Sequence, residues 1–234
     1  MNYKPFLTFY EKHKIIPVHQ NLNDIEKHIQ RRNGLYQQLG IIPSFLKGKS
    51  IIEFGPGTGD NSVHTASHMP REYVLVDGNK YSVDAINEKI ASGILPKTTV
   101  ELVHCNILNY TSKKKFDIVL SEGLIPGQVD PSNFTKHVGS FTKSGGCLVI
   151  TTMSNVSYLA EICRRVLKPY IVNLNSSFDD QVAHAVELFE PHLKTLPAET
   201  RPVKDWVLDN IMQPYDYGLE YSIADAIDTL NSDF

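Results

Sequence analysis

The sequence lacks the features of exported, disulfide-stabilised and membrane-spanning proteins. Among its 234 residues, nowhere do 18 apolar residues follow one another, and the N-terminus has no apolar segment of the kind that an export signal needs. The three cysteines, Cys105, Cys147 and Cys163, are odd in number and have no paired spacing, as is typical of reduced core thiols in cytosolic proteins. We therefore expect a cytoplasmic protein without membrane insertion.

An excess of charge of one sign is also lacking. The formal net charge is -3, and acidic and basic residues are dispersed along the chain, so no basic stripe predicts contact with a nucleic-acid backbone. The length suffices for one large α/β domain with additional helices and a core that needs no disulfides. We expect no nucleic-acid partner, and the sequence leaves the oligomeric state open.

Residues 1–45 are polar and helical in pattern, and we predict that they form a helical cover. Asn23 is a candidate N-cap with Glu26 three residues later, and Gly40 ends the helix. Side chains of one helical face recur between these points and are expected to pack on the following domain: Ile25, Ile29, Arg32, Tyr36 and Leu39.

Short apolar runs alternate with helical stretches over residues 46–153, which predicts βαβ units. The predicted strands cover residues 50–54, 73–76, 99–104, 116–120 and 147–151. Helices are predicted to begin near Asp60, near Ser82 and at Asp130. Asp130 is followed by proline at the first helical position. Gly145-Gly146 is expected to turn the chain into the fifth strand. The predicted fold class is α/β: a doubly wound, mostly parallel, Rossmann-like sheet.

The glycine-rich turn at residues 55–59, Gly-Pro-Gly-Thr-Gly, follows the first predicted strand. Glycines let the backbone approach a ligand closely, and the helix N-terminus behind them carries partial positive charge. By itself such a string also fits an ordinary tight turn. Asp77 ends the second apolar run, where a carboxylate accepts hydrogen bonds from ribose hydroxyls. Turn and carboxylate together predict a nucleotide-like ligand.

Glu53 discriminates between nucleotides. A carboxylate two residues before the first glycine would repel a pyrophosphate, but it complements a ligand that carries an ammonium and a sulfonium. The third glycine also comes one residue too early for the Gly-x-Gly-x-x-Gly pattern of dinucleotide sites. Both features favour S-adenosylmethionine over NAD.

Residues 50–59, Ser-Ile-Ile-Glu-Phe-Gly-Pro-Gly-Thr-Gly, resemble motif I of the class I S-adenosylmethionine-dependent methyltransferases. Further matches follow in the family's order up to about Thr152: residues 74–78 resemble the ribose-binding motif, 105–107 the adenine contact and 116–123 the fourth-strand motif beside the methyl group. A looser resemblance is to methyltransferases of the small-molecule or surface-carbohydrate type. The resemblance implies S-adenosylmethionine as cofactor and S-adenosylhomocysteine as product.

The resemblance also implies a set of cofactor-binding residues, in which the N-terminal segment takes part because it folds over the cofactor in relatives. The set is Glu53, Phe54, Gly55, Gly57, Gly59, Asn61, Asp77, Gly78, Asn106, Ile107, Ser121, Glu122, Arg31 and Tyr36. Either Arg31 or Arg32 would pair with the methionine carboxylate, or both are solvated.

Two departures from the family pattern stand out. Asn106 occupies a position where many relatives have aspartate against the adenine amino group, although its carbonyl oxygen can accept the same hydrogen bond. After the fifth strand, residues 154–234 predict helices over 158–167, 178–193, 203–212 and 223–230 in place of the family's last antiparallel strand pair. This extension is interpreted as a helical variation or as a chain truncated before those strands, and we favour truncation.

Methyl transfer is an in-line displacement, which depends mainly on alignment and exclusion of water. For a hydroxyl acceptor, Glu122 and His104 are the candidate bases, although Glu122 also suits a cofactor-holding role and His104 a packed position. No metal is predicted, because no Asp-Asn pair follows the fourth strand and the one-turn pair His64 and His68 lacks a carboxylate neighbour.

The sequence therefore predicts an enzyme, an S-adenosylmethionine-dependent methyltransferase that acts on a small-molecule acceptor. We expect O-methylation of a sugar or metabolite hydroxyl without a metal; the aromatic residues over 206–221 either line the acceptor pocket or pack a helical lid. The alternatives are a protein or RNA methyltransferase, which a basic groove would indicate, and a non-catalytic cofactor-binding module.

Overall fold

Five parallel strands form the central sheet of the computed structural model, which describes residues 5–125, 128–173, 175–196, 201–214 and 220–231. The strands are β1 (Ser50–Phe54), β2 (Glu72–Asp77), β3 (Val100–His104), β4 (Phe116–Ser121) and β5 (Thr142–Ile150). Their order is β3-β2-β1-β4-β5, so the winding reverses between β1 and β4. Such a switch point is where open α/β sheets bind ligands, at the carboxyl ends of the strands.

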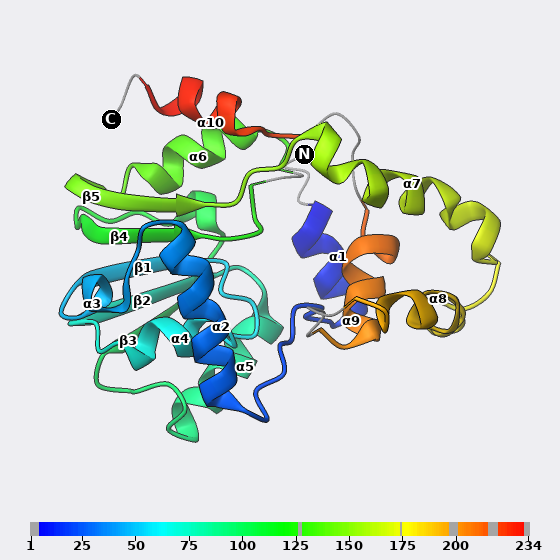
Figure 1. Cartoon of the computed structure of the whole chain (residues 1–234), viewed down its shortest axis with the longest axis horizontal. Coiled ribbons are helices and arrows are strands. Elements are labelled where there is room, and N and C mark those ends of the chain that lie inside the picture. Colours follow the sequence, from blue (N-terminus) through cyan, green and yellow to red (C-terminus); the bar gives the residue numbers. More distant parts are fainter. Residues whose placement is uncertain (1–4, 126–127, 174, 197–200, 215–219, 232–234) are drawn as a thin grey trace.

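Helices cover both faces of the sheet because the strands are apolar on both sides. One face packs against α2 (Ile25–Gln38), α3 (Pro43–Leu46), α4 (Ser62–Ser67) and α5 (Lys80–Ala91). The other face packs against α6 (Pro131–Gly139) and α10 (Ile223–Leu230) (Figure 1). The predicted doubly wound α/β fold is confirmed.

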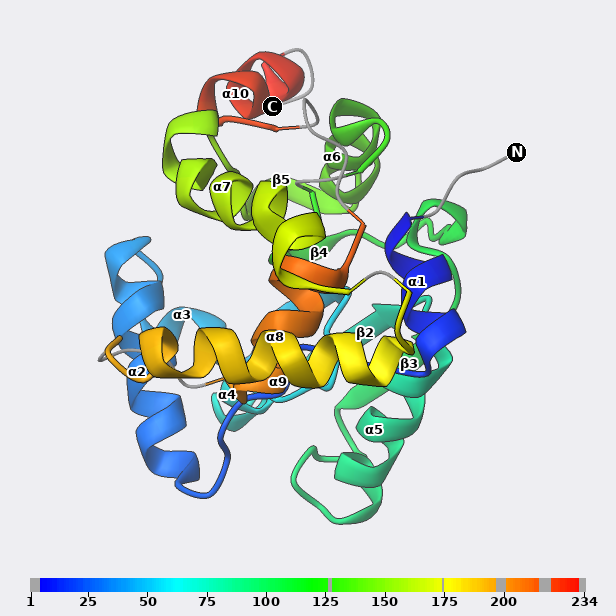
Figure 2. The ribbon, with the colours of Figure 1, turned by 90° about the vertical axis from the view of Figure 1, so that its right-hand side faces the viewer.

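A third apolar core lies beyond the carboxyl edge of the sheet, and we call the elements around it the lid. It joins α1 (Pro5–His13) to α7 (Asn155–Ile171), α8 (Phe178–Leu193), α9 (Val203–Val207) and the π-helical turn η2 (Leu208–Met212) (Figures 1 and 2). The N-terminal residues therefore divide between two cores, because α1 packs in the lid while α2 packs on the sheet. Within the described residues, no helix has the length and apolar content to cross a bilayer.

The N-terminal cap and buried face of α2 differ from the prediction. Asp24, not Asn23, is the N-cap, and its carboxylate accepts from the Lys27 N–H at 2.9 Å. His28, Arg32 and Tyr36 form the buried face, whereas the predicted face members Ile25 and Leu39 are exposed. The buried face is rotated because Arg32 and Tyr36 contact Glu122, which directly follows β4. The spacing of apolar residues along the sequence does not predict such a polar contact.

The fifth strand begins earlier than predicted and contains the glycine pair that was expected to precede it. β5 starts at Thr142, and its register with β4 shifts between Phe116 and Ile118. Gly145 has φ +71°, and a Cβ on Gly146 would lie 2.9 Å from the backbone oxygens of Asp117 and Lys143. The glycines therefore form a β-bulge inside the strand instead of a turn before it.

The cysteines are free thiols, as predicted, but they are not all core residues. Cys105 and Cys147 are half-buried beside the two sheet cores, and Cys163 is exposed on α7. Cys163 is not a core thiol, because α7 turns that side of the helix to solvent.

Candidate cofactor and acceptor site

A cavity of about 800 Å³ lies between the carboxyl edge of the sheet and the lid. Loops after β1, β2, β3 and β4 line its sheet side, and residues of α1, α7 and η2 line its lid side. A volume of this order is typical of sites that enclose a small ligand. The cavity brings together, from the predicted set, Glu53, Gly55, Gly57, Asn61, Asp77, Gly78, Asn106, Ile107 and Glu122.

The glycine loop needs glycine for two reasons. Gly55 and Gly57 have φ of +68° and +58°, a region that side-chain-bearing residues rarely adopt. A Cβ on Gly55 would lie 2.4 Å from Leu124, and a Cβ on Gly57 would lie 2.5 Å from Val18. The loop is thus held in a shape that leaves its backbone close to whatever occupies the cavity.

Glu53 is a buried carboxylate at the end of β1. Its Oε2 accepts hydrogen bonds from the hydroxyls of Ser62, at 2.8 Å, and Tyr73. Both donors contact the same oxygen, so Oε1 is the oxygen available to the cavity that Glu53 lines. Burial raises the pKa of Glu53 to about 7, although the two hydroxyls oppose this shift. A cationic ligand beside Oε1 would favour the ionised form.

Asp77 closes β2 with its carboxylate oriented by backbone donors. The Asn79 N–H donates to Oδ1 at 2.7 Å, and the Gly57 N–H donates to Oδ2 at 3.1 Å. Burial raises the pKa of Asp77 to about 6 against the effect of these donors. Each oxygen retains a lone pair for a further donor, so the geometry suits the two adjacent hydroxyls of a ribose.

Asn106 lines the cavity at the end of β3, but its side chain already makes a local contact. Its Oδ1 accepts from the Leu108 N–H at 2.9 Å and so caps the 3-10 turn η1 (Ile107–Asn109). Its Oδ1 keeps a second lone pair, and its NH2 group keeps two donors, so both parts of the amide are available to a ligand in the cavity. The predicted adenine contact of Asn106 stays a prediction.

Glu122 follows β4 and is held by two residues of α2. Arg32 Nη2 lies 2.7 and 2.9 Å from its two carboxylate oxygens, and the Tyr36 hydroxyl donates to Oε1. Arg32 and Tyr36 are almost fully buried, whereas Glu122 is partly exposed at the cavity. The arginine that acts here is Arg32, which fixes a carboxylate of the site. Arg31 instead lies near Gln20 and His28 and does not line the cavity.

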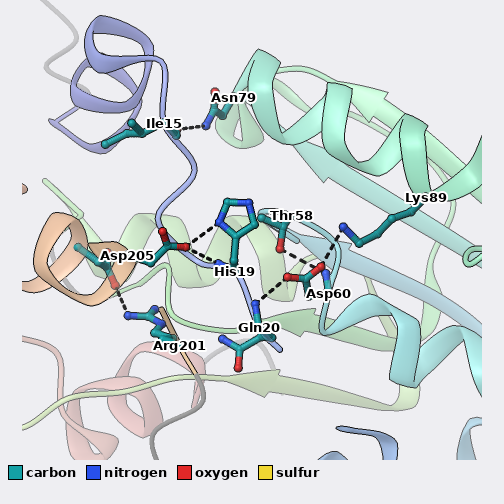
Figure 3. A network of polar contacts seen from close by, with 10 residues as sticks. Ile15, His19, Gln20, Thr58, Asp60, Asn79, Lys89, Arg201 and Asp205 are labelled. Atoms are coloured by element: carbon teal, nitrogen blue, oxygen red, sulfur yellow. Dashed lines mark hydrogen bonds and ion pairs between the residues drawn. The ribbon is translucent and has the colours of Figure 1, made fainter. Parts of the chain in front are cut away.

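Residues 15–20, which we call the strap, cross the cavity between α1 and α2 (Figure 3). The Ile15 carbonyl accepts from Asn79 Nδ2 at 3.2 Å, and the Gln20 N–H donates to Asp60 Oδ2 at 2.7 Å. Lys89 pairs with the other oxygen of Asp60. Between these anchors, Val18 packs over Gly57. The strap thereby covers the glycine loop and lines one side of the cavity.

The strap is also fixed to the lid. Both the N–H of His19 and its ring Nδ1 lie within hydrogen-bond distance of Asp205 Oδ2 on α9, at 2.9 and 2.6 Å (Figure 3). Asp205 is nearly buried, and the His19 side chain is half exposed. No pattern in the sequence predicts this contact, because the partners lie 186 residues apart.

Polar side chains line the lid side of the cavity. Arg165 donates to the carbonyls of Asp209 and Gln213, each at 2.8 Å, and so caps the π-helical turn. Arg201 pairs with Asp209 Oδ2 at 2.9 Å, and the Tyr10 hydroxyl lies 2.9 Å from the Gln213 amide. The cavity therefore has a cofactor side built from strand ends and a polar second side built from helices.

Several predicted residues lie outside the cavity lining. Phe54 packs in a sheet core, Gly59 packs against Ile86 on α5, and Ser121 is fully buried at the end of β4. These three residues pack beneath the loops that line the cavity and support their conformation. Tyr36 also lies outside the lining and acts through Glu122.

His104 is exposed at the end of β3 and is likewise absent from the cavity lining. Its position beside Asp77 in the sheet register does not direct it to the acceptor side. The geometry therefore gives no support to its predicted role as a base.

The one-turn histidine pair serves the packing of α4. His64 Nε2 and His68 Nε2 both lie 2.9 Å from Oδ1 of the Asn33 side chain, and burial lowers the pKa of His64 to about 3. Within the described residues, no three His, Cys, Asp or Glu side chains gather as a metal site would require.

Comparisons with known proteins identify the family of the chain. A family model described as "Methyltransferase domain" matches residues 45–202. Malonyl-[acyl-carrier protein] O-methyltransferases 1 and 2 of Ilyobacter polytropus are each 23% identical, over 141 and 135 residues, or 60% and 57% of this chain. The chain covers 49% of the length of either relative.

Solved structures share the fold at low identity. Magnesium protoporphyrin IX methyltransferase from Synechocystis PCC 6803, with bound SAH, aligns with a TM-score of 0.52 over 96% of this chain and 83% of its own, at 12% identity. PKMT2 from Rickettsia typhi, in complex with AdoHcy, aligns with a TM-score of 0.52 over 81% of this chain and 40% of its own, at 16% identity. Because the family model covers the sheet and helices α7 and α8 of the lid, the chain belongs to the methyltransferase domain family, of the class I S-adenosylmethionine-dependent type.

Proposed function

We propose that this protein is a methyltransferase that transfers the methyl group of S-adenosylmethionine to a small-molecule acceptor. The observation that carries the proposal is a single cavity of about 800 Å³, which Glu53 and Asp77 line on the sheet side and polar residues line on the lid side. A cavity roofed by its own strap and helices suits a small acceptor better than a macromolecular chain.

The residues on the sheet side fit this cofactor. We propose that Asp77 accepts hydrogen bonds from the ribose hydroxyls, that Glu53 Oε1 accepts from the ammonium group and that Asn106 and Ile107 contact the adenine. When bound, the cofactor supplies a methyl group on a sulfonium. The strap and Leu124 cover the glycine loop and keep water from the reacting centre.

For Glu122 we propose a cofactor-holding role. Both of its oxygens already accept charge-assisted hydrogen bonds from Arg32, and Tyr36 donates to one of them, so accepting a proton would oppose these interactions. A fixed carboxylate next to Glu53 complements the cationic end of the cofactor. Alignment, rather than proton transfer by Glu122, is then the main contribution of the site.

The acceptor atom that we propose is the oxygen of a sugar or metabolite hydroxyl, methylated without a metal. The lid side offers both hydrogen-bond donors and acceptors, from Tyr10, Arg165, Asp209 and Gln213, as a polyhydroxylated acceptor requires. The curated relatives carry names that describe O-methylation, which supports an oxygen acceptor here.

Calorimetry with S-adenosylmethionine and S-adenosylhomocysteine tests the cofactor site. Asp77→Ala is expected to weaken both ligands by about 10-fold to 100-fold, because two hydrogen bonds to a buried carboxylate are lost. Asp84→Ala, an exposed position on α5, is the matched control and should bind normally. The proposal fails if neither ligand binds the wild type.

Transfer of a labelled methyl group to a metabolite extract tests the activity. Labelled small-molecule product that disappears in Asp77→Ala supports the proposal. Persistent absence of product with tight cofactor binding would indicate a non-catalytic module, and label on added protein or RNA would indicate a macromolecular acceptor.

The cofactor-holding role of Glu122 is tested first by cofactor binding, which needs no acceptor. Glu122→Gln should weaken binding of S-adenosylmethionine about 5-fold to 20-fold, while Tyr36→Phe, which keeps the carboxylate and Arg32, should weaken it less. Unchanged cofactor affinity in Glu122→Gln, followed by a large loss of turnover, would instead assign it as the base.

A further inference from the structure

Helix α7 is amphipathic in the reverse of the usual sense. Its polar residues face the protein: Tyr158 and Arg165 line the cavity, Arg164 lies over the Trp206 ring and Lys168 donates to the Met212 carbonyl. Surface helices ordinarily place their apolar stripe on the core and their charges in water. In α7 the core side is already occupied by charge-assisted contacts, so the apolar stripe points outward.

The outward side of α7 is apolar along the whole helix. Val156 and Tyr170, at its two ends, are 86% and 84% exposed, and Leu159, Val166 and Leu167 are 50–59% exposed. Ala160 and Cys163 complete the stripe and are also exposed. Scattered apolar residues on a surface are ordinary, but seven on one helix face form a contiguous patch of the kind that marks an interface. In Figure 1, α7 runs along the outside of the lid, with α8 and α9 on one side of it.

The order of residues in this stripe is symmetric about Cys163. Three residues to either side are Ala160 and Val166, and four to either side are Leu159 and Leu167. Seven to either side are Val156 and Tyr170. Spacings of three, four and seven keep all of these residues on one face of a helix.

We propose that α7 is the interface of a homodimer, in which two copies of α7 pack antiparallel about a two-fold axis at Cys163. A two-fold interface uses the same patch on both subunits. The axis places Leu159 against Leu167 of the partner, and small Ala160 against larger Val166 of the partner, which allows the side chains to interdigitate. The stripe carries no charge, so no like charges meet across the axis.

The apolar surface continues past one end of the helix. The antiparallel bridge between Met153 and Tyr221 sets the start of α10 beside the start of α7, and Ile223 on α10 is 68% exposed. In the antiparallel pair, Tyr170 of the partner lies at the N-terminal end of α7, beside Ile223. A helix pair alone stays below the roughly 1,200 Å² of a standard interface, so we expect a dissociation constant on the order of micromolar.

Sedimentation equilibrium of the full chain between about 1 and 200 µM tests the proposal. The wild type should change from monomer to dimer over this concentration range. Leu159→Glu and Leu167→Lys should each be monomeric throughout, with a wild-type circular dichroism spectrum. Leu188→Glu on α8, a helical leucine of similar exposure away from the stripe, should dimerise as the wild type does.

The double variant Leu159→Glu/Leu167→Lys tests the antiparallel register. Each glutamate would then face a lysine of the partner, and dimerisation should return at least in part. Residues 159 and 167 lie two turns apart in one helix and do not pair within it, so recovery requires the second copy. If both single variants are monomeric and the double variant stays monomeric although folded, the antiparallel register is wrong.

A short bismaleimide, which alkylates two thiols without an oxidant, probes the axis. Cross-linked dimer should form in the wild type and disappear in Cys163→Ser, because Cys105 and Cys147 are less exposed. The proposal is overturned by a monomer at all concentrations or by a dimer that survives Leu159→Glu. A monomer that binds phosphatidylcholine–phosphatidylglycerol vesicles through Leu159 would also overturn it and would identify α7 as a membrane-surface helix.

Discussion

Glu53 is a single residue whose surroundings change its chemistry. A glutamate in water titrates near 4.5, but burial raises the pKa of Glu53 to about 7, so near neutral pH it is half ionised before a ligand binds. Under the proposed function it contacts an ammonium group, and only the ionised form makes that contact favourable. Cofactor binding is therefore linked to release of a proton.

We predict that binding of S-adenosylmethionine tightens about twentyfold between pH 6 and pH 8, because over that range the ionised fraction of Glu53, with a pKa of about 7, rises about tenfold and that of Asp77, with a pKa of about 6, rises about twofold. Calorimetry in buffers of different ionisation enthalpy measures the accompanying proton release at pH 6. Glu53→Gln should keep only the roughly twofold change that Asp77, with a pKa of about 6, contributes. An equally steep dependence in Glu53→Gln would contradict the assignment.

At the scale of elements, the strap connects the two halves of the cavity. It contacts the sheet side through Asp60 and Asn79 and the lid through Asp205. A segment fixed at both sides and packed over the glycine loop sets the access of ligands to that loop.

We predict that Asp205→Ala loosens the strap, because the N–H and the ring of His19 lose their shared acceptor. Dissociation of S-adenosylmethionine should quicken about fivefold to tenfold, and trypsin should cut faster after Lys14. Stopped-flow dissociation and limited proteolysis measure these changes. Asp228→Ala on α10, where the aspartate is exposed, is the control, and equal behaviour of the two variants would show that the strap is held by other contacts.

The β-bulge in β5 requires glycine for a steric reason. Gly146→Ala places a methyl group 2.9 Å from two backbone oxygens, and we expect the free energy of unfolding to fall by about 1–3 kcal/mol. Gly34→Ala, inside α2 with no atom within 4 Å of the added methyl, should raise it by up to about 1 kcal/mol. Urea unfolding of both variants measures the contrast. A neutral Gly146→Ala would show that the bulge can relax.

At the scale of the whole molecule, the buried groups Glu53 and His64 make the free energy of unfolding depend on pH in opposite directions. Glu53 has a folded pKa above its unfolded value, so its contribution to stability is fully present below pH 4.5 and is lost as the pH rises through 7. His64, with a folded pKa of about 3, is ionised less readily than in the unfolded chain, so its contribution is present above pH 6.5 and is lost as the pH falls.

We predict that the free energy of unfolding of the wild type, relative to Glu53→Gln, falls by about 3 kcal/mol between pH 4.5 and pH 8, which is the cost of ionising a group shifted from 4.5 to about 7. Urea titrations of the two proteins across this range measure the difference. A constant difference would mean that Glu53 titrates normally in the folded protein.

The sequence by itself determined the sheet, the glycine loop and the two carboxylates at the strand ends. The strand at residues 50–54 and the helices at 178–193 and 223–230 have the predicted bounds, because periodicity, caps and turn residues act over a few neighbouring positions. The same holds for Asp130, which caps α6 as its sequence predicts.

Only the tertiary structure decided which distant residues meet. Arg32 holds Glu122 across 90 positions, and His19 meets Asp205 across 186; neither pair has a local signal. The outward apolar face of α7 likewise follows from what its charged face contacts, since periodicity locates two faces of a helix but not the one that is buried. The lid, the strap and the acceptor side of the cavity therefore depend on packing between elements, which acts between segments far apart in the chain.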